Sequence, residues 1–305
     1  MTHPQLARRE FLLGVAAAGA TGCFAAGALA AEPNAEGGLK EPVYRVAKAK
    51  NEVAKGEVAN PGGEHPLDPA LKVARETLSL VQNTIDDYTC TMVKRERIKG
   101  VLGDHEYMQA KVRNRKLDEN GKIKTPLSAY LKFVKPKNVE GREVVWVEGQ
   151  NNGKLKAHEG GLLGRTLPSV WLDPEGALAM RGQLHPIYDI GIENLVLKLI
   201  DRGEKEKKFG ECEVKFVPGA KINGRGCTVL VVTHPVQRPH FEFHKAEIFI
   251  DDAMKIPLRY AAYFWPAAPG SEELPVIEEY TYLNVKLNVG LTDADFRPDN
   301  PNYNF

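Results

Sequence analysis

The feature that most constrains this fold is the stretch 211–264, whose pattern predicts consecutive antiparallel strands. At its centre, residues 227–234 (CTVLVVTH) are apolar or β-branched on both alternating phases, which indicates a central strand covered on both faces. The dipeptide Asn223-Gly224 joins it to the preceding strand as a two-residue hairpin, because both positions tolerate the positive φ of such a turn. Pro218 makes that preceding strand an edge or bulged strand, since proline donates no hydrogen bond to the ladder.

Further strands are expected on both sides of this centre. Apolar and polar residues alternate between turn signals along the whole chain, which predicts strands at 88–98, 105–115, 128–134, 143–148, 154–158, 241–250, 256–264 and 277–285. The sequence therefore predicts one long antiparallel meander.

Two amphipathic helices interrupt this meander. Apolar residues recur at spacings of three and four from Leu71 to Ile85, which predicts a helix with Asp68 as its N-cap. A second apolar stripe begins at Ile192 and is expected to stop at Gly203, because glycine commonly ends helices.

The N-terminal residues 1–30 resemble a twin-arginine signal peptide. Arg8 and Arg9 precede a weakly apolar stretch that is too short to anchor stably in a bilayer. The sequence departs from the usual pattern at Ala7, where Ser or Thr is common, and at Leu13, where Lys is frequent. The resemblance implies an exported protein, located in the periplasm or otherwise outside the cytoplasm.

Two processing outcomes remain open for this segment. Cleavage can follow the sequence Ala28-Leu29-Ala30, or Cys23 can be lipidated within a sequence similar to a lipobox. Residues 31–64 are rich in Ala, Glu, Lys, Gly and Asn and are expected to form a flexible linker. Residues 65–305 are expected to fold as one domain, with no transmembrane segment once the signal is removed.

Composition and charge exclude some classes of partner. The 305-residue chain is 43% hydrophobic and carries a formal net charge of +1, so it can bury a sizeable core. Arg8, Arg9 and Glu10 account for that charge, which leaves the rest of the chain neutral. This balance gives no indication of nucleic acid or of an anionic membrane surface as a partner.

Three cysteines follow Cys23, and their pairing is open. The Asn223-Gly224 register places Cys227 opposite Ala220 and Cys212 opposite Pro235, too far apart for a disulfide. Any bridge would therefore involve Cys90, and three free thiols are an equal alternative.

The most suggestive polar cluster is His240, Glu242 and His244, which would share one face of a strand. Two adjacent members could chelate a metal ion, but the two histidines would lie roughly 13 Å apart on a strand. A solvated polar face is the simpler interpretation, so we expect no metal and no other cofactor. The chain holds no Gly-x-Ser-x-Gly sequence, phosphate-binding glycine loop or Cys-x-x-Cys pair, and we expect no catalytic residues and no enzyme.

The order of elements resembles a known fold. A helix, a meander, a helical insertion and the 223–224 hairpin are followed by the strands around 248–251 and 256–260, and this order looks like the lipoprotein-carrier fold of the LolA, LolB and RseB type. The resemblance implies an α+β architecture, with a curved antiparallel sheet forming an incomplete barrel that helices cover. The segments 87–97, 234–240 and 300–305 more narrowly resemble an exported planctomycetal family of unknown function.

Large aromatic residues on such a sheet suggest a cavity. If the helices cover the curved sheet incompletely, an apolar cavity remains, and its candidate lining is Trp146, Phe241, Phe243, Phe249, Tyr260 and Phe264. The preferred hypothesis is a non-enzymatic binding protein for a lipid, an acyl chain or a lipoprotein segment. The alternatives are an envelope structural or signalling protein that docks a protein partner on its sheet, and a metal-dependent enzyme centred on His240, Glu242 and His244.

Overall fold

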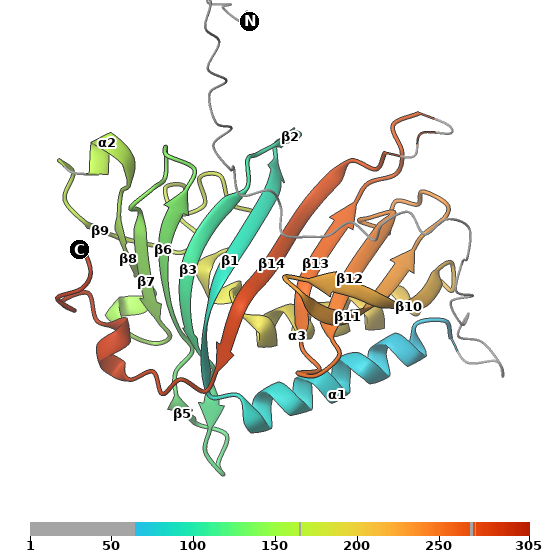
Figure 1. Cartoon of the computed structure of the whole chain (residues 1–305), viewed down its shortest axis with the longest axis horizontal. Helices are drawn as coiled ribbons and strands as arrows, with labels where there is room; N and C mark the ends of the chain where they lie inside the picture. The colour runs from blue at the N-terminus through green and yellow to red at the C-terminus, as the bar shows by residue number, and fades with distance from the viewer. Residues whose placement is uncertain (1–64, 165, 269–270, 272) are drawn as a thin grey trace, which may run out of the picture. The chain divides into compact units, whose positions relative to one another are not determined.

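The computed structural model describes residues 65–305, apart from 165, 269, 270 and 272. The expected signal peptide, the linker and Cys23 lie outside these residues. Within them a sheet of 12 antiparallel strands runs in the order β10-β11-β12-β13-β14-β1-β3-β6-β7-β8-β9, with β2 paired to β1 (Figure 1). The sheet is open, with β10 and β9 at its two edges. The expected α+β fold, a curved antiparallel sheet with helices packed against it, is therefore confirmed.

The elements have the following bounds. The sheet strands are β1 (Asp87–Ile98), β2 (Val101–Leu102), β3 (Glu106–Arg113), β6 (Ser128–Lys135), β7 (Glu143–Val147), β8 (Leu155–His158), β9 (Val170–Leu172), β10 (Glu213–Ile222), β11 (Arg225–Thr233), β12 (Lys245–Asp251), β13 (Pro257–Tyr263) and β14 (Val276–Leu287). A separate small hairpin holds β4 (Lys116–Leu117) and β5 (Ile123–Thr125). The helices are α1 (Asp68–Thr84), α2 (Gly161–Gly164), α3 (Ile192–Glu206) and three short 3-10 turns, η1 (Asn151–Gly153), η2 (Ile187–Asp189) and η3 (Asp293–Phe296).

The central hairpin forms as its turn residues predict. Asn223 and Gly224 have φ values of 47° and 81°, and Ile222 pairs with Arg225. Pro218 lies in an irregularity of the edge strand β10, between Val217 and Ala220. This irregularity shifts the pairing by one residue, so that Glu213 lies opposite Thr233 and Cys212 falls beside His234. The expectation that Cys212 lies opposite Pro235 is therefore wrong.

The segment before β12 is a loop, which corrects the predicted strand at 241–250. The backbone N–H of His234 donates to the carbonyl of His244 over 2.7 Å, so ladder pairing ends there and the residues between them leave the sheet. Within the loop the ring of Phe241 stacks on His234 at 3.8 Å between centroids. Pro235 and Pro239 offer no N–H to a ladder, which favours this departure.

Helices α1 and α3 pack against each other and against strands β11 to β13. Leu71 of α1 belongs to one apolar cluster with Leu230 and Ile248 of the sheet. Gly203 does not end α3, because the helix continues to Glu206. A Cβ atom at Gly203 would lie 2.8 Å from Leu71 Cδ2, so this glycine allows the two helices to approach closely. At the start of α1, Asp68 is the first helical residue and Leu67 the N-cap, which corrects the predicted cap by one position.

Candidate functional site

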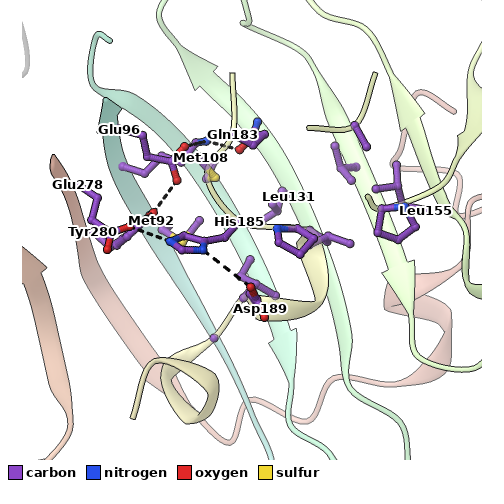
Figure 2. A pocket seen from close by; sticks show the side chains of 18 of the residues that line it. Met92, Glu96, Met108, Leu131, Leu155, Gln183, His185, Asp189, Glu278 and Tyr280 are labelled. Carbon is purple, nitrogen blue, oxygen red and sulfur yellow. Dashed lines mark hydrogen bonds and ion pairs between the residues drawn. The ribbon is translucent and has the colours of Figure 1, made fainter. Parts of the chain in front are cut away.

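A large cavity lies between one face of the sheet and the segments that cover it. Its volume is about 830 Å³, within the range of ligand-binding pockets. The sheet provides its floor, and the connection 173–191 together with α3 provides its cover. Figure 2 shows the floor residues Met92 and Met108 together with His185 and Asp189 of the cover.

The floor is built by residues that share one face of the sheet. Tyr260 lies opposite Tyr280, Met92 lies opposite both Tyr282 and Met108, and Met108 lies opposite Phe133. Directly opposed residues project to the same side of a sheet. All of them line the cavity.

The cavity has an apolar end and a polar end. Strands β6 to β9 contribute mainly apolar side chains to it, namely Leu131, Phe133, Val144, Leu155, Ala157, Val170 and Leu172. Near β1, β14 and α3 the lining is instead rich in charged and hydroxyl groups, namely Lys94, Glu96, Glu278, Tyr280, Tyr260, Lys198 and Arg202. One part of the lining is thus mainly apolar and the other mainly polar.

Glu96 is the centre of the polar end on strand β1. Its carboxylate accepts hydrogen bonds from Lys94 Nζ at 3.1 Å, from the backbone N–H of Leu184 at 3.2 Å and from the Tyr280 hydroxyl at 2.5 Å. Lys94 also donates to the side chain of Gln183. These contacts fasten the cover to the floor (Figure 2).

Glu278 on β14 makes a second connection to the cover. His185 Nε2 lies 2.8 Å from Glu278 Oε2, and His185 Nδ1 lies 3.2 Å from Lys198 Nζ of α3. Lys198 donates in turn to Asp189 Oδ2 at 2.5 Å. One chain of polar contacts therefore joins the sheet, the 173–191 connection and α3.

The pKa values in this group follow from burial and from these partners. Burial by itself would raise the pKa of Glu278, but the hydrogen bond and charge of His185 outweigh it and hold that pKa below its usual value. Burial and the neighbouring carboxylates raise the pKa of Tyr280 far above its ordinary value. Glu278 is therefore a carboxylate and Tyr280 a neutral hydroxyl at neutral pH.

The six aromatic candidates lie in different places. Tyr260 lines the cavity, and Phe243 shares with it a much smaller void of about 70 Å³ beneath α1 and α3. The other four are outside the large cavity. Trp146 and Phe249 are core residues, Phe241 stacks on His234, and Phe264 is 40% exposed.

The proposed metal candidates do not share a strand face, because they lie in the loop before β12. His240 stacks on Phe209 at 3.8 Å, Glu242 pairs with Arg202, and His244 Nδ1 lies 2.9 Å from the carbonyl of His234. Among the described residues, no group of three or more His, Cys, Asp or Glu is placed to hold a metal ion. The enzyme alternative thus loses the geometry on which it was based.

The three described cysteines are free thiols. Burial raises the pKa of Cys90 to about 12 and those of Cys212 and Cys227 to about 11. They are therefore protonated at neutral pH and weak nucleophiles. In the part of the chain that the structure covers, no helix is long and apolar enough to cross a membrane.

Residues 85–305 match the family described as "Protein of unknown function (DUF1571)". The chain belongs to this family. The DUF1571 match begins at the end of α1 and includes the whole sheet, the cavity floor and its cover. No curated protein matches the chain.

Solved structures with similar folds are distant. A DUF1329 family protein from Desulfovibrio piger is 12% identical, with a TM-score of 0.36 and coverage of 77% of this chain and 98% of that one. MucB in the Pseudomonas aeruginosa MucA/MucB complex is 14% identical, with a TM-score of 0.39 and coverage of 75% and 60%. A LolA superfamily protein from Nitrosomonas europaea is 10% identical, with a TM-score of 0.27 and coverage of 75% and 97%.

Sequence reasoning missed the polar end of the cavity. Lys94 and Glu96 stand in a strand that reads as half solvated, and Glu278 stands in another strand about 180 residues later. The structure buries Lys94 to 6% exposure and both glutamates to 7%. The local signal for this polar end is the pair Lys94 and Glu96. Because one residue separates them in the strand, both side chains lie on the same face of the sheet.

Proposed function

We propose that this DUF1571 protein is an exported, non-enzymatic binding protein that holds an amphiphile in the cavity beneath the 173–191 connection. The ligand class is a lipid, an acyl chain or the acylated segment of a lipoprotein. The observation that carries the proposal is the 830 Å³ cavity with an apolar end over β6 to β9. A space of this size and lining favours a hydrocarbon chain, because each buried methylene stabilises the complex by about 0.8 kcal/mol.

Titration with a neutral fluorescent probe, N-phenyl-1-naphthylamine, tests the proposal. We expect saturable binding by the delipidated protein and displacement of the probe by long-chain amphiphiles. Ala157→Trp, which fills the apolar end, should weaken binding by about ten-fold or more, since an indole removes space that the ligand needs. Val101 is 72% exposed, so Val101→Trp serves as the matched control and should bind like the wild type.

Mass spectrometry of solvent extracts from freshly purified protein provides an independent measurement. A co-purified amphiphile that is absent from Ala157→Trp supports the proposal. Lack of saturable binding by the wild type, together with empty extracts, would contradict it and favour the role in protein docking.

Export is the part of this proposal that rests on residues 1–30. Arg8 and Arg9 are the strongest feature of a weakly apolar signal. Replacing both by Lys should leave the protein in the cytoplasmic fraction, and unchanged export would exclude the twin-arginine route.

A further inference from the structure

The polar end of the cavity holds two carboxylates in direct opposition. Glu96 on β1 pairs in register with Glu278 on β14, and each residue is only 7% exposed. Like charges directly opposite each other destabilise a sheet, and buried carboxylates need compensating donors or cations. The partners of each carboxylate therefore determine how its charge is compensated.

Glu96 has more donors than Glu278. Three groups donate to Glu96, including the Tyr280 hydroxyl at 2.5 Å. The same hydroxyl lies 3.1 Å from Glu278 Oε2, but it carries one proton and donates to one carboxylate at a time. The shorter contact assigns that proton to Glu96. Glu278 then depends chiefly on His185, whose side chain is itself 38% exposed.

Aromatic rings flank this carboxylate. The rings of Tyr260 and Tyr280 are parallel within 7°, with centroids 6.4 Å apart, and the ring of His185 lies 6.2 Å from Tyr280. All three residues line the cavity. Tyrosine faces together with a carboxylate are the groups that recognise ammonium ions in proteins.

Cationic side chains of α3 lie next to this aromatic and acidic group. Arg202 donates to the Tyr260 hydroxyl over 3.2 Å, and Lys198, four residues earlier on the same helix face, contacts His185 over 3.2 Å. Both residues line the cavity. If a head group places its ammonium near Glu278, Arg202 and Lys198 lie beside it and can bind a phosphate of the same head group.

We propose that Glu278, Glu96, Tyr260 and Tyr280 form a subsite for the ammonium group of an amphiphile. The ligand is then a cationic or zwitterionic amphiphile whose chain occupies the apolar end over β6 to β9. This inference rests on the proposed function, because it assigns the head group of the ligand that the cavity holds. The ammonium would lie against the Glu278 carboxylate and the tyrosine rings, and Arg202 and Lys198 would donate to the phosphate where the head group is zwitterionic.

The test compares four amphiphiles with the same twelve-carbon chain. Dodecyltrimethylammonium, dodecylphosphocholine, dodecanol and dodecyl sulfate would each displace N-phenyl-1-naphthylamine below their micelle concentrations. We expect the trimethylammonium compound to bind about ten-fold more tightly than dodecanol, the order expected for a partly desolvated cation on tyrosine faces. The phosphocholine should also exceed dodecanol, and the sulfate should bind more weakly than the trimethylammonium compound.

Variants assign the preference to the site. Glu278→Gln should reduce the ammonium preference to within about three-fold of dodecanol while dodecanol affinity stays unchanged. Tyr280→Phe removes a hydroxyl and keeps the ring, and it serves as a second variant if Glu278→Gln does not fold. It should also alter the preference for the ammonium compound over dodecanol. Glu119→Gln is the control, because Glu119 is exposed between β4 and β5 and does not line the cavity, and it should keep the wild-type order.

The outcomes separate this inference from the proposed function. Equal affinity for all four compounds, or tighter binding of dodecyl sulfate than of dodecyltrimethylammonium, would overturn the ammonium subsite and leave the apolar cavity intact. An unchanged preference in both Glu278→Gln and Tyr280→Phe would also overturn it. Failure of every compound to bind, dodecanol included, would overturn the proposed function itself.

Discussion

Glu279 illustrates how single residues of this sheet store stability that depends on pH. It alternates with Tyr280 along β14 and therefore lies on the face opposite the cavity. Its carboxylate contacts Arg259 Nη2 at 2.5 Å and His105 Nε2 at 2.8 Å. Burial by itself would raise the pKa of Glu279. The hydrogen bond from His105 and the charge of Arg259 outweigh the effect of burial and lower this pKa to about 2.

The lowered pKa of Glu279 predicts acid sensitivity. The free glutamate titrates near 4.3, so the unfolded chain binds this proton at a higher pH than the folded protein does. The stabilisation is therefore complete above about pH 5 and decreases as the pH falls toward 2. Urea unfolding between pH 6 and 3 should show a smaller loss of unfolding free energy in Glu279→Gln than in the wild type. Equal pH dependence of both proteins would contradict the assignment.

At the scale of elements, the contact between α1 and α3 depends on the absence of a side chain at Gly203. Because a Cβ there would lie 2.8 Å from Leu71 Cδ2, Gly203→Leu should separate the helices and lower the unfolding free energy by about 1–3 kcal/mol, as overpacking does. The double variant Gly203→Leu with Leu71→Ala should recover part of this loss, since side-chain volume is moved from one helix to the other. Thermal unfolding of the wild type, both single variants and the double variant measures both effects. If the double variant is as unstable as the sum of the single changes, the proposed contact is wrong.

The elements that could be predicted are those that local chemistry determines. Asn223 and Gly224 set the hairpin because their backbone tolerates positive φ, and the apolar stripes set both helices. The limits of β12 depended instead on His244, whose backbone bonds to His234 and Tyr263 end the ladder. Pro235 and Pro239 favour the departure from the sheet, but no local pattern marks His244 as the position where the chain returns to it. The fold class was therefore accessible from sequence, whereas this loop required tertiary contacts.

The candidate site was less accessible for the same reason. A curved sheet with only two substantial helices suggested a cavity, but of the six candidate lining residues the structure places only Tyr260 in the 830 Å³ cavity. Five of the six aromatic candidates are used in the core, in the loop before β12 or at the surface. The actual floor depends on the pairing of β1 with β14, which brings Glu96 to Glu278. Such distant pairings cannot be read from alternation alone.

At the scale of the whole described molecule, the cavity has a floor and a cover of unequal stability. The strands of the floor bury apolar residues such as Tyr88, Met108 and Val112, each at most 1% exposed. The cover, residues 173–191, is fastened through polar contacts to Lys94, Glu96 and Glu278, and its apolar residues such as Ile187 and Ile190 are only partly buried against the core. Segments with few buried apolar contacts open locally at lower free energy than a packed sheet does.

This difference predicts the pattern of amide hydrogen exchange. In the ligand-free protein, amides of the cover should exchange faster than those of β1 and β14, because the cover opens without unfolding the sheet. Dodecylphosphocholine should slow exchange in the cover by up to about 100-fold at 100 times its dissociation constant, since a bound ligand stabilises the closed form by about 2.7 kcal/mol at that concentration. The strands should change little, because their exchange already requires more extensive opening. Exchange measured by mass spectrometry on the wild type and on Ala157→Trp tests this. Equal protection of cover and strands without ligand, or slowing that persists in Ala157→Trp, would show that the 173–191 connection does not control access to the cavity.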